Sequence, residues 1–393
     1  MKQRKLLVLL IICLLTVSLA ACGDNGNVQD DYPPASEGLK FTMYDTYCEV
    51  SGIGECQDTD IVIPRSYNDL PVTGIVGAFF RNTTITSVII PDSVTTIGLG
   101  SFKDCTSLES VTIEGGTTAI DMLAFANCTA LTSVKMGEGV TAIGDSAFSG
   151  CTSLTDVTIP DSVTTVGHSV FWECYSLTNV TIGKGLTAIG ESMFYKTGLT
   201  SVTIPDGITF IGYQAFLGAD FTSVTIPDSV TTIGKEAFAY TPLTSVTIPD
   251  SVTTIGNAAF YGCTGLKSVT IPDSVTFLGS STFSECTGLT DVTIGKGVTV
   301  IDDYTFYNCT GLTNVTIPDG VKTIGHSAFS GCRNLASVTI PGSVTFIGGW
   351  GFRDCGSLRT VYYLGSKTDW ANIEIDGGNT TLKWADIHYE GES

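Results

Sequence analysis

The thirteen cysteines are the residues of this chain with the most obvious capacity for chemistry. Nine of them recur at one position of an internal repeat and form two runs: Cys105, Cys128, Cys151 and Cys174, then Cys263, Cys286, Cys309, Cys332 and Cys355. A zinc site needs clustered Cys or His pairs, and no repeat supplies one. A disulfide ladder would fit the spacing of stacked strands. However, equivalent side chains should point in parallel, and a run of five cysteines would leave one unpaired. We therefore expect buried free thiols that fill space as small apolar groups.

Cys48 and Cys56 differ from these nine because they precede the repeat. Disulfides persist in proteins that leave the reducing cytoplasm. For an exported chain, the sequence is therefore compatible both with a Cys48–Cys56 disulfide and with two free thiols.

The histidines and carboxylates do not form a catalytic or metal-binding pattern. His168 and His326 occupy the same repeat position seven repeats apart, and His388 lies near the C-terminus, so neither a metal triad nor a Ser-His-Asp arrangement is expected. Most repeats carry an acidic residue in the turn after the first strand, which could form a calcium-binding column. Lys184 and Lys296 interrupt that column, which favours an ordinary turn residue. The sequence predicts no enzyme, no metal and no cofactor.

The charge balance restricts the class of partner. Nineteen Lys+Arg against 39 Asp+Glu give a formal net charge of −20. Binding to nucleic acid requires a basic surface that displaces counterions from phosphates. Attraction to an anionic membrane surface also requires basic residues. The composition therefore argues against both, and no nucleic-acid partner is expected.

The N-terminus indicates export. Lys2, Arg4 and Lys5 precede an apolar run that is too short to span a bilayer, which is typical of a cleaved signal peptide over residues 1–21. "LAAC" at Leu19–Cys22 resembles the processing site of bacterial lipoproteins. That resemblance implies lipidation of Cys22, with residues 22–40 as a flexible tether and the protein anchored to the bacterial cell membrane, facing outward.

A repeat of 22 or 23 residues organises the rest of the chain. It is marked by a phenylalanine that recurs thirteen times, from Phe79 to Phe352. Alternating apolar and polar residues such as "TDVTIP" predict a short strand, Pro-Asp-Ser predicts a turn, "VTTVG" predicts a second strand, and "HSVFWEC" predicts a short helical or 3₁₀ turn whose Phe points inward. One repeat cannot bury its own apolar face, so stacking of repeats must form the core.

The spelling L-x-x-V-x-I…V-x-x-I-G-x-x-A-F-x-x-C resembles the BspA-like leucine-rich repeat family of bacterial surface proteins. The resemblance implies a β-rich, right-handed repeat solenoid of about 13 coils over residues 75–361. Residues 41–74 resemble the N-terminal cap of this family. Residues 362–393 resemble its C-terminal cap, where Trp370, Trp384 and Tyr389 are expected to cover the open end.

Two exposed sets of side chains are candidates for binding. Thr158, Thr181, Thr203 and Thr225 belong to a row of hydroxyl side chains on the first strand, although threonine is also simply a good strand residue. Trp172, Tyr195, Tyr261 and Tyr307 follow the marker Phe and vary where the repeat is otherwise uniform.

Proteins of the resembled family are associated with adhesion. The resemblance therefore implies a non-catalytic binding module for host, matrix or neighbouring-cell proteins. The alternative is an envelope spacer or a polysaccharide-contacting module without a discrete protein ligand.

Overall fold

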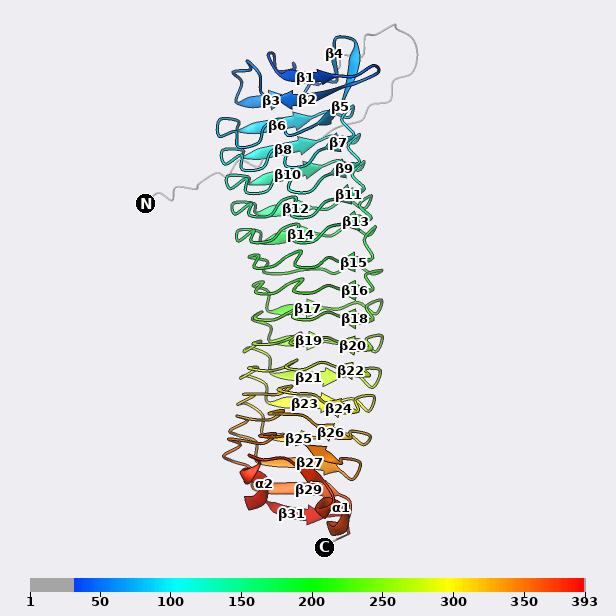
Figure 1. Ribbon diagram of the computed structural model, residues 1–393, viewed down its shortest axis with the longest axis vertical. Helices are drawn as coiled ribbons and strands as arrows, with labels where there is room; N and C mark the ends of the chain where they lie inside the picture. The colour runs from blue at the N-terminus through cyan, green and yellow to red at the C-terminus, as the bar shows by residue number, and fades with distance from the viewer. Residues whose placement is uncertain (1–31, 392–393) are drawn as a thin grey trace, which may run out of the picture. The chain divides into compact units, whose positions relative to one another are not determined.

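The computed structural model describes residues 32–391. The expected signal peptide and Cys22 lie outside the described residues. From Pro34 onward the chain is one compact unit, a stack of about fifteen coils in which each coil contributes to two rows of strands (Figure 1). The predicted capped, β-rich solenoid is confirmed. Its coil count exceeds the thirteen marker Phe residues because both caps add strands to the rows.

The first row contains the longer strands. Its members are β3 (Asp60–Val62), β6 (Ser87–Ile90), β8 (Ser110–Ile113), β10 (Ser133–Met136), β12 (Asp156–Thr158), β14 (Asn179–Thr181), β17 (Ser223–Thr225), β19 (Ser245–Thr247), β21 (Ser268–Ile271), β23 (Asp291–Ile294), β25 (Asn314–Thr316), β27 (Ser337–Pro341), β29 (Thr360–Leu364) and β31 (Asp386–Tyr389).

The second row lies on the adjoining side of the coils. Its members are β2 (Cys48–Gly52), β5 (Leu70–Ile75), β7 (Thr96–Ile97), β9 (Ala119–Ile120), β11 (Ala142–Ile143), β13 (Thr165–Val166), β15 (Ala188–Ile189), β16 (Phe210–Ile211), β18 (Thr232–Ile233), β20 (Thr254–Ile255), β22 (Phe277–Leu278), β24 (Val300–Ile301), β26 (Thr323–Ile324), β28 (Phe346–Ile347) and β30 (Glu374–Ile375).

Equivalent repeat positions pair in parallel within each row. Val111 lies beside Val134 in the first row, and Ile120 lies beside Ile143 in the second. Threonine side chains reinforce this register, since Thr141 Oγ1 donates to the Thr118 carbonyl one coil earlier at 3.0 Å. Part of the threonine content of the repeat is therefore explained by the stacking itself.

The segment around each marker Phe, which we call the marker turn, differs from the expected helical or 3₁₀ turn. Alternate backbone N–H groups leave the coil: Phe102 N donates to the Ala124 carbonyl at 2.7 Å, whereas Lys103 N donates to Gly100 at 3.0 Å. Most marker turns contain two residues with positive φ, such as Gly100 (58°) and Asp104 (60°). These left-handed residues reorient successive peptide groups, so alternate backbone N–H groups donate to the next coil. A continuous 3₁₀ helix would direct its donors to its own carbonyls instead.

The core is a continuous column of stacked rings. Consecutive marker Phe side chains from Phe79 to Phe352 have ring centroids 4.9–5.7 Å apart. In the 22-residue coils Thr197, Ala219 and Thr241 replace the cysteine. There the buried Phe221 side chain packs edge-on against Phe216 at 5.6 Å. Burial of each such side chain contributes about 1.5–3 kcal/mol.

Both ends of the stack are covered. β1 (Lys40–Met43) pairs antiparallel with β2, and β4 (Ser66–Tyr67) pairs with β5. At the other end lie α1 (Lys367–Ala371) and α2 (Thr380–Trp384). Trp370 and Tyr389 pack against Tyr363 as expected of a cap. The expectation for Trp384 was wrong. Its side chain is 85% exposed, because Leu382 is the residue of α2 that is buried.

Candidate functional site

The hydroxyl row of the first strands is exposed, and one of its coils lacks a regular strand. Thr158, Thr181 and Thr225 lie on the outer faces of β12, β14 and β17. Thr203 lies between β14 and β17 but forms only an isolated bridge to Thr225, so no regular strand forms where the first short coil begins. The ladder is also interrupted between β19 and β21 and between β23 and β25.

A shallow depression lies where the coil of Thr203 lacks a regular strand. Thr158, Thr181 and Thr203 line a hollow of about 270 Å³, and a second hollow of about 460 Å³ shares Thr181 and Thr203 with it. Lys184 and Asp206 border the second hollow. The structure thus brings three of the four predicted threonines to one depression that has hydroxyl groups and both signs of charge.

The predicted aromatic set separates into two groups. Trp172 stacks on Tyr195 with ring centroids 5.7 Å apart, and the Lys196 ammonium lies 5.2 Å from the Tyr195 ring centre. Tyr261 and Tyr307 belong to a different part of the stack, where the proximity of Tyr240 and Tyr307 contributes, after burial, to raising the pKa of Tyr261. All four side chains are half-buried.

Sequence reasoning missed the more exposed aromatic residues of the second group. Tyr240 is 60% exposed and packs edge-on against Tyr261 at 5.1 Å. The ring centroids of Tyr304 and Tyr307 lie 5.7 Å apart. Tyr240, Tyr304 and Trp350 all have positive φ of 58–59°. No other repeat carries an aromatic residue at these two columns, so an aromatic residue there is the signal that could have revealed them.

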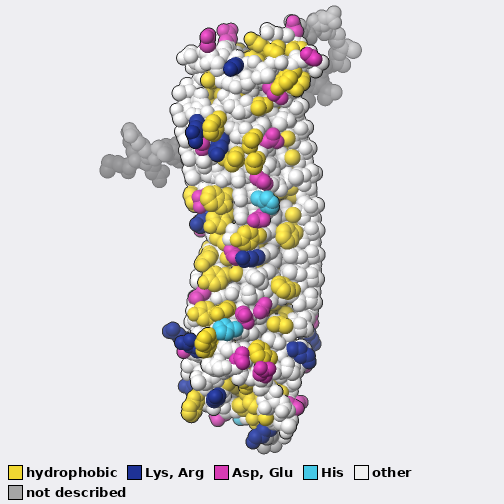
Figure 2. Space-filling model, in the orientation of Figure 1, with side chains coloured by type: hydrophobic (Ala, Val, Ile, Leu, Met, Phe, Trp, Pro, Cys, Tyr) yellow, Lys and Arg dark blue, Asp and Glu magenta, His cyan; other side chains and the backbone are white. Residues whose placement is uncertain are grey.

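A second exposed group lies at the N-terminal end. Val76, Leu99 and Met122 each precede the marker Phe by three residues in consecutive coils, and they are 51%, 57% and 45% exposed. We call these three residues the apolar stripe. The next coils carry Asp145, His168 and Glu191 at the same position. Figure 2 shows hydrophobic side chains in separate groups on one face, amid a mostly uncharged polar surface.

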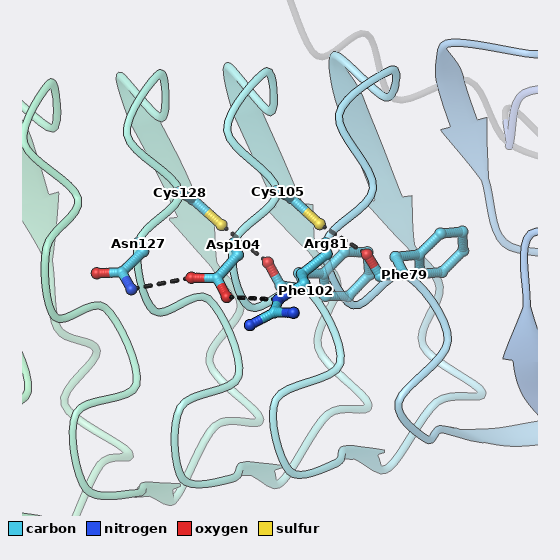
Figure 3. A network of polar contacts seen from close by, with 7 residues as sticks. All are labelled: Phe79, Arg81, Phe102, Asp104, Cys105, Asn127 and Cys128. Atoms are coloured by element: carbon cyan, nitrogen blue, oxygen red, sulfur yellow. Dashed lines mark hydrogen bonds and ion pairs between the residues drawn. The ribbon is translucent and has the colours of Figure 1, made fainter.

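The repeat cysteines are buried free thiols, as expected, but they are also hydrogen-bond donors. Cys105 Sγ donates to the Phe79 carbonyl at 3.0 Å, and Cys128 Sγ donates to the Phe102 carbonyl at 3.1 Å (Figure 3). Each thiol therefore binds the marker Phe of the preceding coil. Burial raises the pKa of Cys174, Cys263 and Cys355 to about 12 in each case. A protonated, enclosed thiol is neither a nucleophile nor a metal ligand.

Side chains beside this thiol row form a polar surface network. Asp104 accepts hydrogen bonds from Arg81 Nε at 3.5 Å and from Asn127 Nδ2 at 2.9 Å (Figure 3). These residues occupy the left-handed position two residues after the marker Phe. Because their side chains point outward across successive coils, the network joins coils without taking part in the core.

The two N-terminal cysteines are free and buried. Cys48 Sγ lies 3.6 Å from the Pro71 carbonyl and 3.7 Å from the Leu70 carbonyl. Of the two alternatives left by the sequence, the structure contains the unbonded one.

The remaining candidates for chemistry do not converge. His168 Nδ1 lies 3.6 Å from Glu191, and His388 stacks on Tyr362. Asp161 and Asp273 of the acidic column accept the backbone N–H of Lys184 and Lys296 in the next coil, each at 2.8 Å, rather than bonding within their own turn. Within residues 32–391, no three His, Cys, Asp or Glu side chains are placed to hold a metal ion. In the same part of the chain, no helix has the length and apolar character needed to cross a membrane.

Comparisons with known proteins agree with this architecture. The model of the BspA type leucine-rich repeat region matches residues 73–198, 118–241, 187–313 and 231–359. A leucine-rich repeat protein from Bacteroides ovatus is 28% identical with a TM-score of 0.74, and the match covers 91% of this chain and 99% of that one. A leucine-rich cell surface protein from Faecalibacterium prausnitzii is 30% identical with a TM-score of 0.55, covering 88% and 99%.

A more distant similarity concerns the fold alone. The pneumococcal vaccine antigen PcpA is 16% identical with a TM-score of 0.53, over 91% of this chain and 98% of that chain. No curated protein matches the chain.

Proposed function

Because this chain belongs to the BspA-type leucine-rich repeat family, we propose that it is an exported, lipid-anchored binding module that attaches to proteins of a host, a matrix or neighbouring cells. The Faecalibacterium protein of the same fold is described as a cell surface protein, which supports this location. In this proposal the lipid on Cys22 holds the solenoid at the outer side of the membrane.

The apolar stripe carries the proposal of protein attachment. Val76, Leu99 and Met122 project from consecutive coils, and strand spacing places them about 4.8 Å apart along the stack. Exposed apolar side chains in a contiguous row mark interaction sites, because leaving them in water has no stabilising effect on the fold. Lys235 occupies the same position of a later coil, so the scaffold accepts a charged residue there. The fold therefore does not require apolar residues at this position, and they occur together in the first coils.

Direct binding measurements test this proposal. The lipid-free chain from Gly23 to Ser393 is titrated against immobilised matrix proteins and mucins at low and physiological salt. We expect saturable, salt-tolerant binding to one protein class, and at least tenfold weaker binding for Leu99→Lys combined with Met122→Lys. Asn257→Lys adds a positive charge at the same column of a distant coil and serves as the matched control.

The two possible failures have different meanings. Binding that is unaffected by the stripe variants would remove the stripe from the proposal. A well-folded chain that binds no protein would favour the envelope spacer instead.

The anchor is tested separately in producing cells. We expect Cys22→Ala to shift the protein from the membrane fraction to the soluble exported fraction, because the acceptor of the lipid is then missing. Retention of the variant in the membrane fraction would contradict lipidation of Cys22.

A further inference from the structure

A run of aromatic side chains crosses the C-terminal marker turns. Tyr240 contacts Tyr261, Tyr304 contacts Tyr307, and His326 lies 5.4 Å from Tyr304 and 4.9 Å from Trp350 between ring centroids. Tyr261 and Tyr307 lie two coils apart, and Tyr307 is among the groups that raise the pKa of Tyr261, after burial, Tyr240 and Glu285. We call these six residues the aromatic strip. They span five coil steps, which corresponds to about 24 Å along the stack.

Folding does not account for the most exposed members of the strip. Tyr240, Tyr304 and Trp350 are 60%, 38% and 45% exposed, so they contribute little to the core. Their φ angles of 58–59° are a property of the repeat, because the residues two before and two after the Phe have positive φ in every marker turn. Glycine occupies the same two columns at Gly100 and Gly262. The rings are therefore not required to form the marker turn.

Polar groups accompany the rings. The Glu285 backbone N–H donates to the Tyr307 carbonyl at 2.7 Å, and its carboxylate accepts a hydrogen bond from Asn308 Nδ2 at 3.0 Å. At the end of the strip the Arg353 guanidinium lies 5.8 Å from the Trp350 ring centre. The strip thus combines exposed ring faces with carboxylate, amide and guanidinium groups that can accept and donate hydrogen bonds.

We propose that the aromatic strip binds an extended neutral polysaccharide. Sugar rings present C–H faces that pack on aromatic rings and hydroxyl groups that bond to Glu285, Asn308 and Arg353. An open row of rings suits a linear polymer, whereas protein hot spots lie in enclosed, water-excluding pockets. The chain's net charge of −20, with Glu285, Asp303 and Asp354 on the marker turns of this region, opposes a polyanion such as nucleic acid or an acidic polysaccharide. This site is separate from the apolar stripe, so it stands or falls independently of attachment to proteins.

The test is titration of the chain from Gly23 to Ser393 with laminarin, galactomannan, xyloglucan and soluble starch. Binding is followed by retardation in polysaccharide-containing gels and by tryptophan fluorescence. Tyr240→Gly, Tyr304→Gly and Trp350→Gly remove one ring each and install the residue that the repeat uses elsewhere at these columns, so the coil is retained. We expect at least one of the four polymers to bind and each variant to weaken that binding about tenfold.

The controls separate the strip from other aromatic residues. Tyr175→Ala removes a ring that is 52% exposed and belongs to an earlier coil, and it should leave binding unchanged. Equal binding by the strip variants and the wild type would overturn the proposal. The absence of binding to all four polymers would also overturn it. Binding to hyaluronan at low salt that is stronger than binding to these neutral polymers would overturn it as well. Leu99→Lys with Met122→Lys should bind the polysaccharide normally, whatever happens to protein attachment.

Discussion

The coils that carry Leu99 and the coils that carry Tyr304 share one backbone design but present different surfaces. Both bury a marker Phe, and the cysteine three residues after that Phe donates to a carbonyl of the preceding coil: Cys105 does so at 3.0 Å and Cys309 at 3.1 Å. On the outside, the first region exposes aliphatic side chains and the second exposes aromatic rings with adjacent polar groups. The inward positions are constrained by stacking, and the outward positions are not. This scaffold can therefore carry different binding surfaces along one stack without a change of fold.

The largest expected effect tests whether the two regions share the same interior. Burial raises the pKa of Cys174 in the first run of cysteines and of Cys263 and Cys355 in the second to about 12. A raised pKa means that the folded state holds the proton more tightly, so the associated stability is complete below the unfolded pKa of about 8.5 and is lost as the pH rises toward 12. Each of these thiols should lower the free energy of unfolding by about 1.4 kcal/mol per pH unit across this window.

Chemical denaturation at pH 8, 9, 10 and 11 measures this loss. Cys263→Ala should lower the stability at pH 8 but reduce its dependence on pH. A flat profile between pH 9 and 11 would contradict buried, protonated thiols.

The second prediction compares the two cores directly. Phe102→Ala and Phe306→Ala each remove a fully buried ring from the central column. Each substitution should lower the free energy of unfolding by about 3–5 kcal/mol, because the cavity left behind adds to the lost burial. Urea denaturation followed by tyrosine fluorescence and circular dichroism provides the measurement. If one variant were destabilised and the other not, the regions would differ in their interior as well as in their surface.

The third prediction concerns only the surface of the first region. Leu99→Lys with Met122→Lys should weaken attachment to a protein ligand at least tenfold, or about 1.4 kcal/mol, since a charged side chain cannot be desolvated at an apolar contact. The urea midpoint should stay within experimental error, as exposed substitutions rarely alter stability. A large shift of the midpoint would show that the stripe supports the fold.

The smallest expected effect concerns the surface of the second region. Tyr304→Gly should change the free energy of unfolding by less than about 1 kcal/mol, because relief of the left-handed backbone offsets the lost contacts to Tyr307 and His326. Urea denaturation again measures it, with Phe306→Ala as the reference. A cost comparable to that of Phe306→Ala would identify Tyr304 as a structural residue.

Periodicity alone is enough to predict most of the interior. The spacing of Phe79 to Phe352 sets the length of each coil, and the alternation in segments such as "TDVTIP" sets which side chains point inward. The position of Cys105 and its equivalents beside the marker Phe then predicts buried thiols. These features could be inferred because each depends on position within one repeat, and every repeat has the same neighbours above and below.

The surface required the folded structure, because adjacency across coils depends on backbone geometry that the spelling does not reveal. Tyr240 lies two residues after its marker Phe, whereas Tyr304 and Trp350 lie two residues before theirs. The folded marker turns bring each of them against a neighbouring ring. Only the structure shows that Trp172 stacks on Tyr195 and that the first row of strands has no regular strand at Thr203. In a stack of this kind, residue type and period determine what is buried, whereas the local φ angles and the coil length determine which exposed side chains meet.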